Sequence, residues 1–345
     1  MKIKYTFLIV FMLFLYSSQI QAQYATTKVK TKHEKYTDSL KNVEYNYTFP
    51  ILGQEVYKKG FDIPYPAGFM MNYYWLKQGI LIDNLQLGLK TDNLDIPLTP
   101  VDFIDFGKNT NTSYTVNVRP DLWVFPFLNV YGIFGYGNSK TVVNLVAPIE
   151  LKSVVEQKVS TFGVGILGAA GIGPVWVSVD VNWTWNKPEL LDKAVKVNVV
   201  GVRFGHTFVF KNKPESNIAL WAGGMRVNLS SSTKGEIKLI DALPPETWSR
   251  RDDIVSDYND WYDALDLGKK LLVDATAIPD IMDRIDAADG SSIIRYGIDK
   301  QVKENWNGLV GAQYQYNKHW MIRTELGIIG DRKSFLLSLN YRVLL

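Results

Sequence analysis

Cysteine is absent from this sequence, and histidine occurs only three times in 345 residues. Without a thiol the chain can form no disulfide and can carry no lipid on a cysteine, so neither device stabilises or anchors it. Three dispersed histidines also provide no cluster of transition-metal ligands. We therefore expect no metal and no cofactor.

An excess of charge of one sign is also missing. The chain has 38 basic and 35 acidic residues, and removal of the leader described next, with Lys2 and Lys4, would leave 36 basic residues. Because the numbers of basic and acidic residues are nearly equal, the chain has no strong electrostatic field that would attract a polyanion. We expect no nucleic-acid partner.

Long apolar runs are absent except near the N-terminus, where Tyr5 to Tyr16 is unbroken. Lys2 and Lys4 precede this run and Ala22 ends the segment, so residues 1–22 are predicted to be a cleaved secretory signal peptide. About 12 apolar residues are too few for a helical anchor, because the hydrocarbon layer is ~30 Å thick. No later run approaches 18 residues, which excludes a helical inner-membrane protein.

What the sequence does contain is alternation. In residues 113–122, apolar side chains at 114, 116, 118 and 122 alternate with polar ones at 115, 117, 119 and 121, and a similar segment follows Phe125-Pro126. This period of two predicts a β-hairpin with one apolar and one polar face. The pattern recurs in ten predicted strands: 79–90, 113–123, 128–145, 157–171, 175–185, 193–210, 217–229, 306–316, 320–329 and 334–344.

Two segments fall outside this pattern. Residues 23–78 are polar and are predicted to form a periplasmic N-terminal extension, although residues 68–77 could lengthen the first strand. Residues 230–303 form an insertion far longer than a turn requires. Within it, residues 257–288 carry apolar side chains at helical spacing, which predicts one or two amphipathic helices.

The connections distinguish a membrane barrel from a soluble sandwich. With ten strands and both ends in the periplasm, the turns after residues 125, 173, 211 and 317 all fall on the periplasmic side, and the insertion falls outside. The count also places tryptophans at both strand ends, as in interfacial belts: Trp123, Trp176, Trp221 and Trp320 on one side, and Trp183, Trp185 and Trp306 on the other. A sandwich gives no reason for either arrangement.

The hairpin RPDLWVFPFLNVYGIFGYG and the ending YQYNKHWMIRTELGIIGDRKSFLLSLNYRV resemble bacterial outer-membrane β-barrel proteins. The resemblance implies an all-β fold, an antiparallel transmembrane up-and-down barrel of about ten strands (eight to twelve) in residues 79–345, with a long, partly helical extracellular loop. It implies location in the outer membrane and contact with its lipid, and it carries no catalytic or ligand residues.

The polar faces of the predicted strands define a set of lumen-facing charges: Arg119, Asp121, Asp180, Arg203, Arg226, Arg323, Glu325 and Arg342. Two interpretations are open, because a barrel of about eight strands is just filled by its side chains. The charges either form a packed ion-pair network or line a narrow pore that prefers a small polar or anionic solute. In the insertion, Trp261, Leu265 and Leu272 are predicted to pack a helical lid on the outer mouth.

Reactive side chains are sparse. A lipid-modifying barrel enzyme would need a hydroxyl nucleophile with a histidine base in hydrogen-bond reach. His33 lies in the extension, His319 in a turn and His206 at a strand end. We therefore expect no enzyme. The leading interpretation is a structural or surface-interaction barrel with a surface or periplasmic protein partner; a narrow channel and, with His206, a lipid-modifying enzyme are the alternatives.

Overall fold

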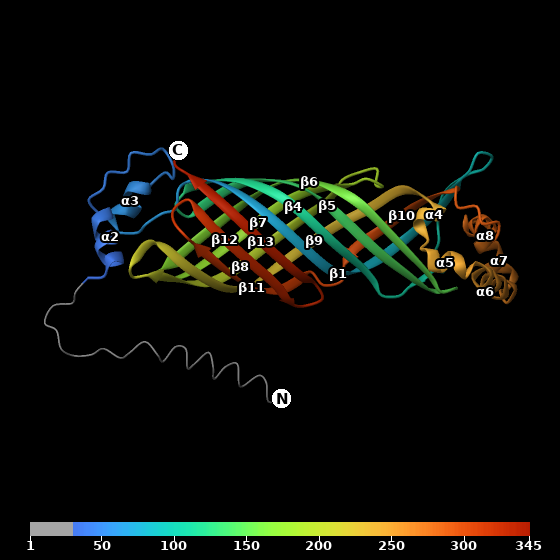
Figure 1. Ribbon diagram of the computed structural model, residues 1–345. Helices are drawn as coiled ribbons and strands as arrows, with labels where there is room; N and C mark the ends of the chain where they lie inside the picture. Colours follow the sequence, from blue (N-terminus) through green and yellow to red (C-terminus); the bar gives the residue numbers. More distant parts are fainter. Residues whose placement is uncertain (1–29) are drawn as a thin grey trace, which may run out of the picture.

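Ten antiparallel strands close into a barrel in the computed structural model, which describes residues 30–345 (Figure 1). The predicted signal peptide, residues 1–22, lies outside the described residues. The barrel strands are β1 (Ala67–Lys90), β4 (Asn109–Phe125), β5 (Leu128–Ala147), β6 (Leu151–Ile172), β7 (Val175–Pro188), β8 (Val195–Phe210), β9 (Lys213–Lys238), β11 (Trp306–Gln315), β12 (Trp320–Ile329) and β13 (Lys333–Val343).

The first and last strands close the ring. β1 pairs with β13 from Ala67↔Val343 to Lys77↔Lys333, and on its other edge it pairs with β4 over the same stretch. Every other barrel strand pairs with its neighbours in sequence, except that β9 pairs with β11. The ten-strand antiparallel barrel expected from the sequence is therefore confirmed.

A belt of apolar side chains surrounds the ring near the end that carries the C-terminus. Its members point outward and are exposed, and they include Met71 on β1, Phe162 on β6, Phe204 on β8, Ile322 on β12 and Leu339 on β13. Aromatic residues at both edges of an apolar band are typical of strands that cross a bilayer. None of the described helices is long and apolar enough to span a membrane.

The longest strands extend well past this belt. β1 has 24 residues and β9 has 26, whereas about 9–11 residues suffice to cross a bilayer. In this extension β10 (Ile293–Val302) takes the place of β11–β13 between β1 and β9. Most outward side chains there are charged or polar, as with Arg295, which pairs with Asp95 and Glu236. This part of the barrel therefore stands outside the membrane.

Short elements cover the two ends. At the far end, the cap consists of α4 (Leu239–Ala242), α5 (Pro245–Ser249), α6 (Arg251–Asp263), α7 (Leu267–Asp274) and α8 (Ile278–Asp286). Beside it, β2 (Asp95–Pro100) pairs with β1, and β3 (Asp105–Phe106) pairs with β5. At the opposite end, near the C-terminus, lie α2 (Lys32–Leu40) and α3 (Gly53–Lys58) (Figure 1).

Two predicted boundaries are wrong. The barrel begins at Ala67 and not at residue 79, so the alternative in which residues 68–77 lengthen the first strand is the correct one, and residues 67–77 pair on both edges with β4 and β13. The insertion is also shorter than 230–303. Residues 231–238, the end of β9, pair with residues 293–300 of β10, so only the residues between these two segments form helices.

The predicted tryptophan belt needs correction on one side. Trp320 is exposed, but Trp123, Trp176 and Trp221 line a cavity inside the barrel. Trp123 and Trp176 lie on the polar faces of their strands, and Trp221 lies on the inward face of β9, which it shares with Met225. Their partners inside the lumen are described below.

Candidate functional site

The lumen is filled at mid-belt by a cluster centred on Arg203, from β8. Its Nε donates to Glu325 Oε2 at 2.7 Å and its Nη2 to Glu325 Oε1 at 3.0 Å, and its Nη1 pairs with Asp180. The three side chains come from β8, β12 and β7, so the contacts cross the interior. Each side chain is about one-tenth exposed, which leaves little room for water at this level.

Glu325 receives two further donors from inside the barrel. Trp221 Nε1 donates to Glu325 Oε2 at 3.0 Å, and Arg323 Nη2 donates to the same oxygen at 3.0 Å. The Arg323 guanidinium also lies 4.7 Å from the centre of the Trp221 ring. A carboxylate with this many charged or polar donors stays ionised and fixed, as buried ion pairs require.

A second cluster lies nearer the C-terminal end. Arg342 Nη2 donates to Asp121 Oδ1 at 2.9 Å, and Asn129 Nδ2 donates to the same oxygen at 2.7 Å. Arg119 stacks over the Tyr131 ring, with 3.5 Å between the guanidinium carbon and the ring centre. Seven of the eight predicted charges therefore face the interior. Six of them form ion pairs there, and Arg119 contacts the Tyr131 ring.

Arg226 is the exception, and its predicted lumen-facing placement is wrong. Arg203 faces inward opposite Gly223, so residues 221, 223, 225 and 227 of β9 face inward and Arg226 faces outward. Arg226 is exposed and lies opposite Trp306. The inward-facing side chains there are Met225 and Val227, and Arg226 shares the outer surface with the exposed Trp306.

Glycines on neighbouring strands make room for the aromatic members of the cluster. Gly311 lies between Trp221 and Glu325 in the sheet, and the indole passes over it to reach the carboxylate. Gly165 lies in the same way between Tyr131 and Asn182, whose side chains share a 2.7 Å hydrogen bond. Cross-strand contact of an aromatic ring with a glycine is a known device of sheets.

Replacing Gly311 by Ala is expected to destabilise the barrel by about 1–3 kcal/mol, because an overpacked interior must shift. A Cβ on Gly311 would lie 2.2 Å from the Trp221 ring, which would have to move off Glu325. Urea unfolding in phospholipid vesicles measures the change. Gly168→Ala is the control, since its Cβ would meet nothing closer than 4.0 Å; equal effects of the two changes would contradict the packing described.

A cavity of about 690 Å³ separates this cluster from the N-terminal extension. Its lining includes Trp123, Trp176 and Arg203 from the barrel and Phe61 from the extension. The extension is therefore docked across this mouth of the barrel. His33 N donates to Lys211 O at 3.1 Å and Ile51 N to Val124 O at 2.9 Å, so backbone contacts hold it at two turns.

Lys318, in the turn between β11 and β12, fixes the extension from the barrel side. Its Nζ lies 2.9 Å from Asp62 Oδ1, and Tyr36 donates to the other oxygen of Asp62 at 3.1 Å. Burial alone would lower the pKa of Lys318, but Tyr36 and Asp62 raise it above its usual value. Burial raises the pKa of Tyr36 to about 12. Lys318 therefore stays protonated and positively charged, and Tyr36 stays neutral, throughout the physiological pH range.

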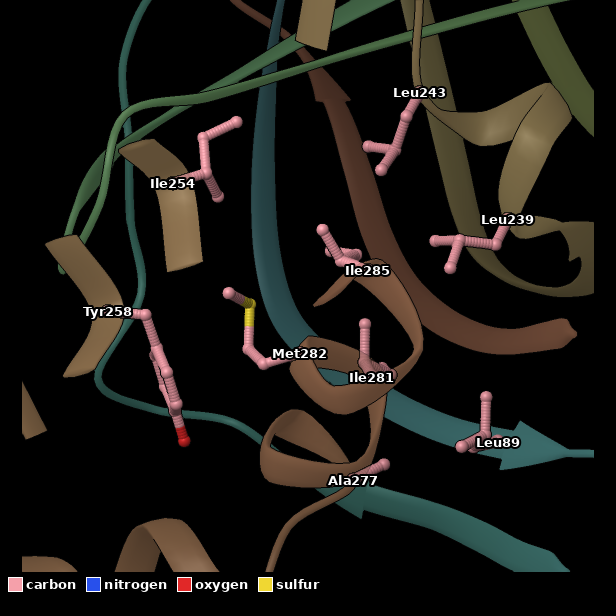
Figure 2. Packing of buried hydrophobic residues seen from close by; sticks show 9 residues of the cluster. All are labelled: Leu89, Leu239, Leu243, Ile254, Tyr258, Ala277, Ile281, Met282 and Ile285. Atoms are coloured by element: carbon pink, nitrogen blue, oxygen red, sulfur yellow. The ribbon is translucent and has the colours of Figure 1, made fainter. Parts of the chain in front are cut away.

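The cap is packed on the far end of the barrel by a hydrophobic core (Figure 2). Ile281, Met282 and Ile285 of α8 form this core with Leu89 of β1 and Leu239 at the start of α4, and the Met282 side chain extends to the other side of α8. The remaining buried members of the cluster are Leu243, Ile254, Tyr258 and Ala277. The hydrophobic core of the cap therefore includes a residue of the barrel wall, Leu89, and the cap is folded onto the barrel.

The predicted lid residues have different fates. Trp261 packs against the cap core and stacks on Phe103 at 5.7 Å, and Leu265 is partly buried. Leu272 is 67% exposed, so its predicted packing on the rim is wrong. Asp266 accepts a hydrogen bond from Lys269 N and starts a new helix, which changes the helical phase after residue 266. The buried residue of α7 is therefore Val273.

No group in the part of the chain described, 30–345, forms a metal site of three or more histidine or acidic ligands. His206 lies on the outward face of β8, where its ring is 4.3 Å from that of Phe208. His319 stacks on Tyr341 and contacts Arg342 O at 2.8 Å. Neither histidine reaches the carboxylates of the lumen.

No protein-family model and no curated protein matches the chain. Among solved structures, the β domain of the Bordetella autotransporter BrkA is similar at 8% identity and TM-score 0.36, over 81% of this chain and 100% of that one. The translocator domain of the autotransporter NalP from Neisseria meningitidis is similar at 10% identity and TM-score 0.34, over 84% and 92%. The Pseudomonas putida toluene transporter TodX is similar at 8% identity and TM-score 0.25, over 82% and 91%.

At these values the similarities add nothing to what the ring of strands already establishes. The strands close completely, as a sheet must when it crosses a bilayer, and an exposed apolar belt surrounds them. Polar pairs fill the interior. The chain is an outer-membrane β-barrel protein.

Proposed function

We propose that this protein is a closed structural barrel that presents its cap outside the membrane for interaction with a surface partner. The observation that carries this proposal is the ion-paired layer of Arg203, Asp180 and Glu325, which crosses the lumen and is about one-tenth exposed. A pore needs a continuous aqueous path, and this layer interrupts it. The docked N-terminal extension narrows the same end of the barrel.

The cap supports the interaction role. The cap has its own buried core, so its surface has a defined shape. On this surface α7 carries three exposed leucines, Leu267, Leu271 and Leu272, with exposed fractions of 76%, 62% and 67%. Neighbouring exposed apolar side chains often mark contact with a partner. Among residues 30–345 no nucleophile and base lie together in the lumen, and the proposal includes no enzyme activity.

Planar-bilayer recording tests the closed state. The wild-type barrel is expected to give no discrete conductance steps. A variant in which residues 239–292 are replaced by a short Gly-Ser linker should also give none, because the block lies at Arg203 and not at the cap. Replacing Arg203, Asp180 and Glu325 together by Ala in the barrel without the cap should produce steps, because the packed cap no longer covers the far end, provided that heat-modifiable gel mobility shows a folded barrel.

Conductance in the wild type would overturn the proposal in favour of a narrow channel for a small polar or anionic solute. Conductance that appears only after the cap is removed would make the cap a gate. Silence in all three folded proteins would move the block away from Arg203, to the extension over the opposite mouth.

A further inference from the structure

A second cavity, of about 200 Å³, lies inside the barrel extension beneath the cap. Its walls come from strands and helices alike, and they are almost entirely apolar: Leu87, Val143, Val155, Leu243, Met282 and Ile298. It lies outside the membrane belt, beyond the charged clusters of the lumen. A small, apolar, preformed cavity with few polar groups is the usual form of a small-molecule site.

One charged side chain lines this cavity. Lys300 faces inward from β10, on the same face as Ile298 and Tyr296. It forms no ion pair with any residue in the described range 30–345, and the cavity lining includes no carboxylate. The other titratable groups of the lining are Tyr258 and Tyr296. Lys300 is partly buried, and an ammonium removed from water without an anion is costly, so a ligand with a negative charge can supply the missing partner.

The wall beside the cavity has a gap in its strand pairing. β7 ends at Pro188 and β8 begins at Val195, so beyond their connection β6 and β9 have no strand between them. A groove of about 640 Å³ lies there, and it shares Val155, Ile237 and Leu243 with the cavity lining. The groove and the cavity are therefore neighbours.

Cap elements cover this gap together with the connection between β7 and β8, which donates backbone hydrogen bonds to Lys158 on one side and Lys234 on the other. Ser153 Oγ donates to Ala242 O at 2.7 Å, and Thr247 Oγ1 donates to Lys152 O at 3.3 Å. Leu191 forms a single bridge to Gly235. α4 also buries Leu239 in the cap core, so a displacement of α4 that opened a lateral route from the surface to Lys300 would disturb this core but would unpair no barrel strand.

We propose that the cavity binds a small hydrophobic carboxylate, with its hydrocarbon part against the apolar lining and its carboxylate on Lys300 Nζ, and that it enters between β6 and β9. An apolar cavity of ~150 Å³ accommodates benzene, so this one suits a ring or chain of about eight carbons. This inference goes beyond the proposed function, because a closed lumen neither requires nor excludes a ligand under the cap.

Octanoate and 1-octanol are the test probes, and calorimetry with the barrel in lipid nanodiscs measures their binding against empty nanodiscs. Lys300→Met keeps the length and apolar stem of the side chain but removes its charge. It is expected to weaken octanoate binding at least tenfold and to change 1-octanol binding less than twofold. Val143→Trp fills the cavity and should weaken both probes.

The pH dependence gives an independent readout. Burial lowers the pKa of Lys300 to about 8. Octanoate binding should therefore weaken as the pH is raised from 7 to 10, whereas 1-octanol binding stays constant and Lys300→Met shows no pH dependence. Octanoate uptake equal to that of empty nanodiscs, or equal affinity in wild type and Lys300→Met, would overturn the proposal. Bilayer recordings are unaffected by either result, so this test and that of the closed lumen fail separately.

Discussion

Replacing Arg203 by Met is expected to lower the free energy of unfolding by about 3–5 kcal/mol, because it leaves the buried carboxylate of Asp180 without a cation and removes one of the two cations of Glu325. Asp180 and Glu325 share Arg203 across the lumen, and both are about nine-tenths buried. Glu325 would keep Arg323 and the Trp221 indole, but Asp180 would keep only Asn182. Urea titration of the barrel in phospholipid vesicles, followed by tryptophan fluorescence, measures the loss.

Arg226→Met is the matched control, since it removes the same charge from an exposed outward position. Surface substitutions of this kind usually change stability by less than ~0.5 kcal/mol. If the two variants unfold at the same urea concentration, the Arg203 cluster contributes no more than an exposed charge. A double change of Arg203 and Asp180 should cost less than the sum of the single changes, because the two residues contact each other.

Ile285→Ala is expected to destabilise the cap by about 2–5 kcal/mol and to leave the membrane-embedded strands paired. Ile285 is 2% exposed and packs at the centre of the cap core, where truncation leaves a void next to Met282 and Leu239. Trypsin added to intact vesicles should then cleave within the cap, at Lys269 or Arg284. Heat-modifiable gel mobility should still report a folded barrel.

Leu272→Ala provides the control in the same region. That side chain is 67% exposed on α7 and contributes little to the core, so protease sensitivity should match the wild type. Rapid cleavage of the wild-type cap, as fast as an unfolded peptide, would contradict a folded cap altogether.

Strand alternation predicted the barrel because its cause is local. Successive side chains of a strand point to opposite faces, so the alternation within residues 175–185 and 334–344 predicts an apolar and a polar face without knowledge of the neighbouring strands. The helical phase of the cap was harder, because the break at Asp266 depends on one capping hydrogen bond. The sequence signal for this break was Asp266, a residue type that often caps the start of a helix, followed closely by Gly268.

Register could not be predicted in this way. The passage of Trp221 over Gly311 to Glu325 joins three strands, and nothing in the sequence aligns residues 221, 311 and 325. The same holds for the cavity under the cap, which is formed only when β10 replaces β11–β13 between β1 and β9. Arg226 was assigned to the wrong face because charge was taken as a mark of the lumen, whereas above the membrane the outer surface is polar too.

The position of Arg342 has a consequence for the order of assembly. Its Nε donates to Tyr65 O at 2.6 Å and its Nη2 to Pro66 O at 2.9 Å, directly before the first strand, while the residue itself belongs to the last. The N-terminal segment can accept these hydrogen bonds only when β13 has met β1. We therefore expect residues 64–66 to become protected from protease only when the seam between the first and last strands has closed.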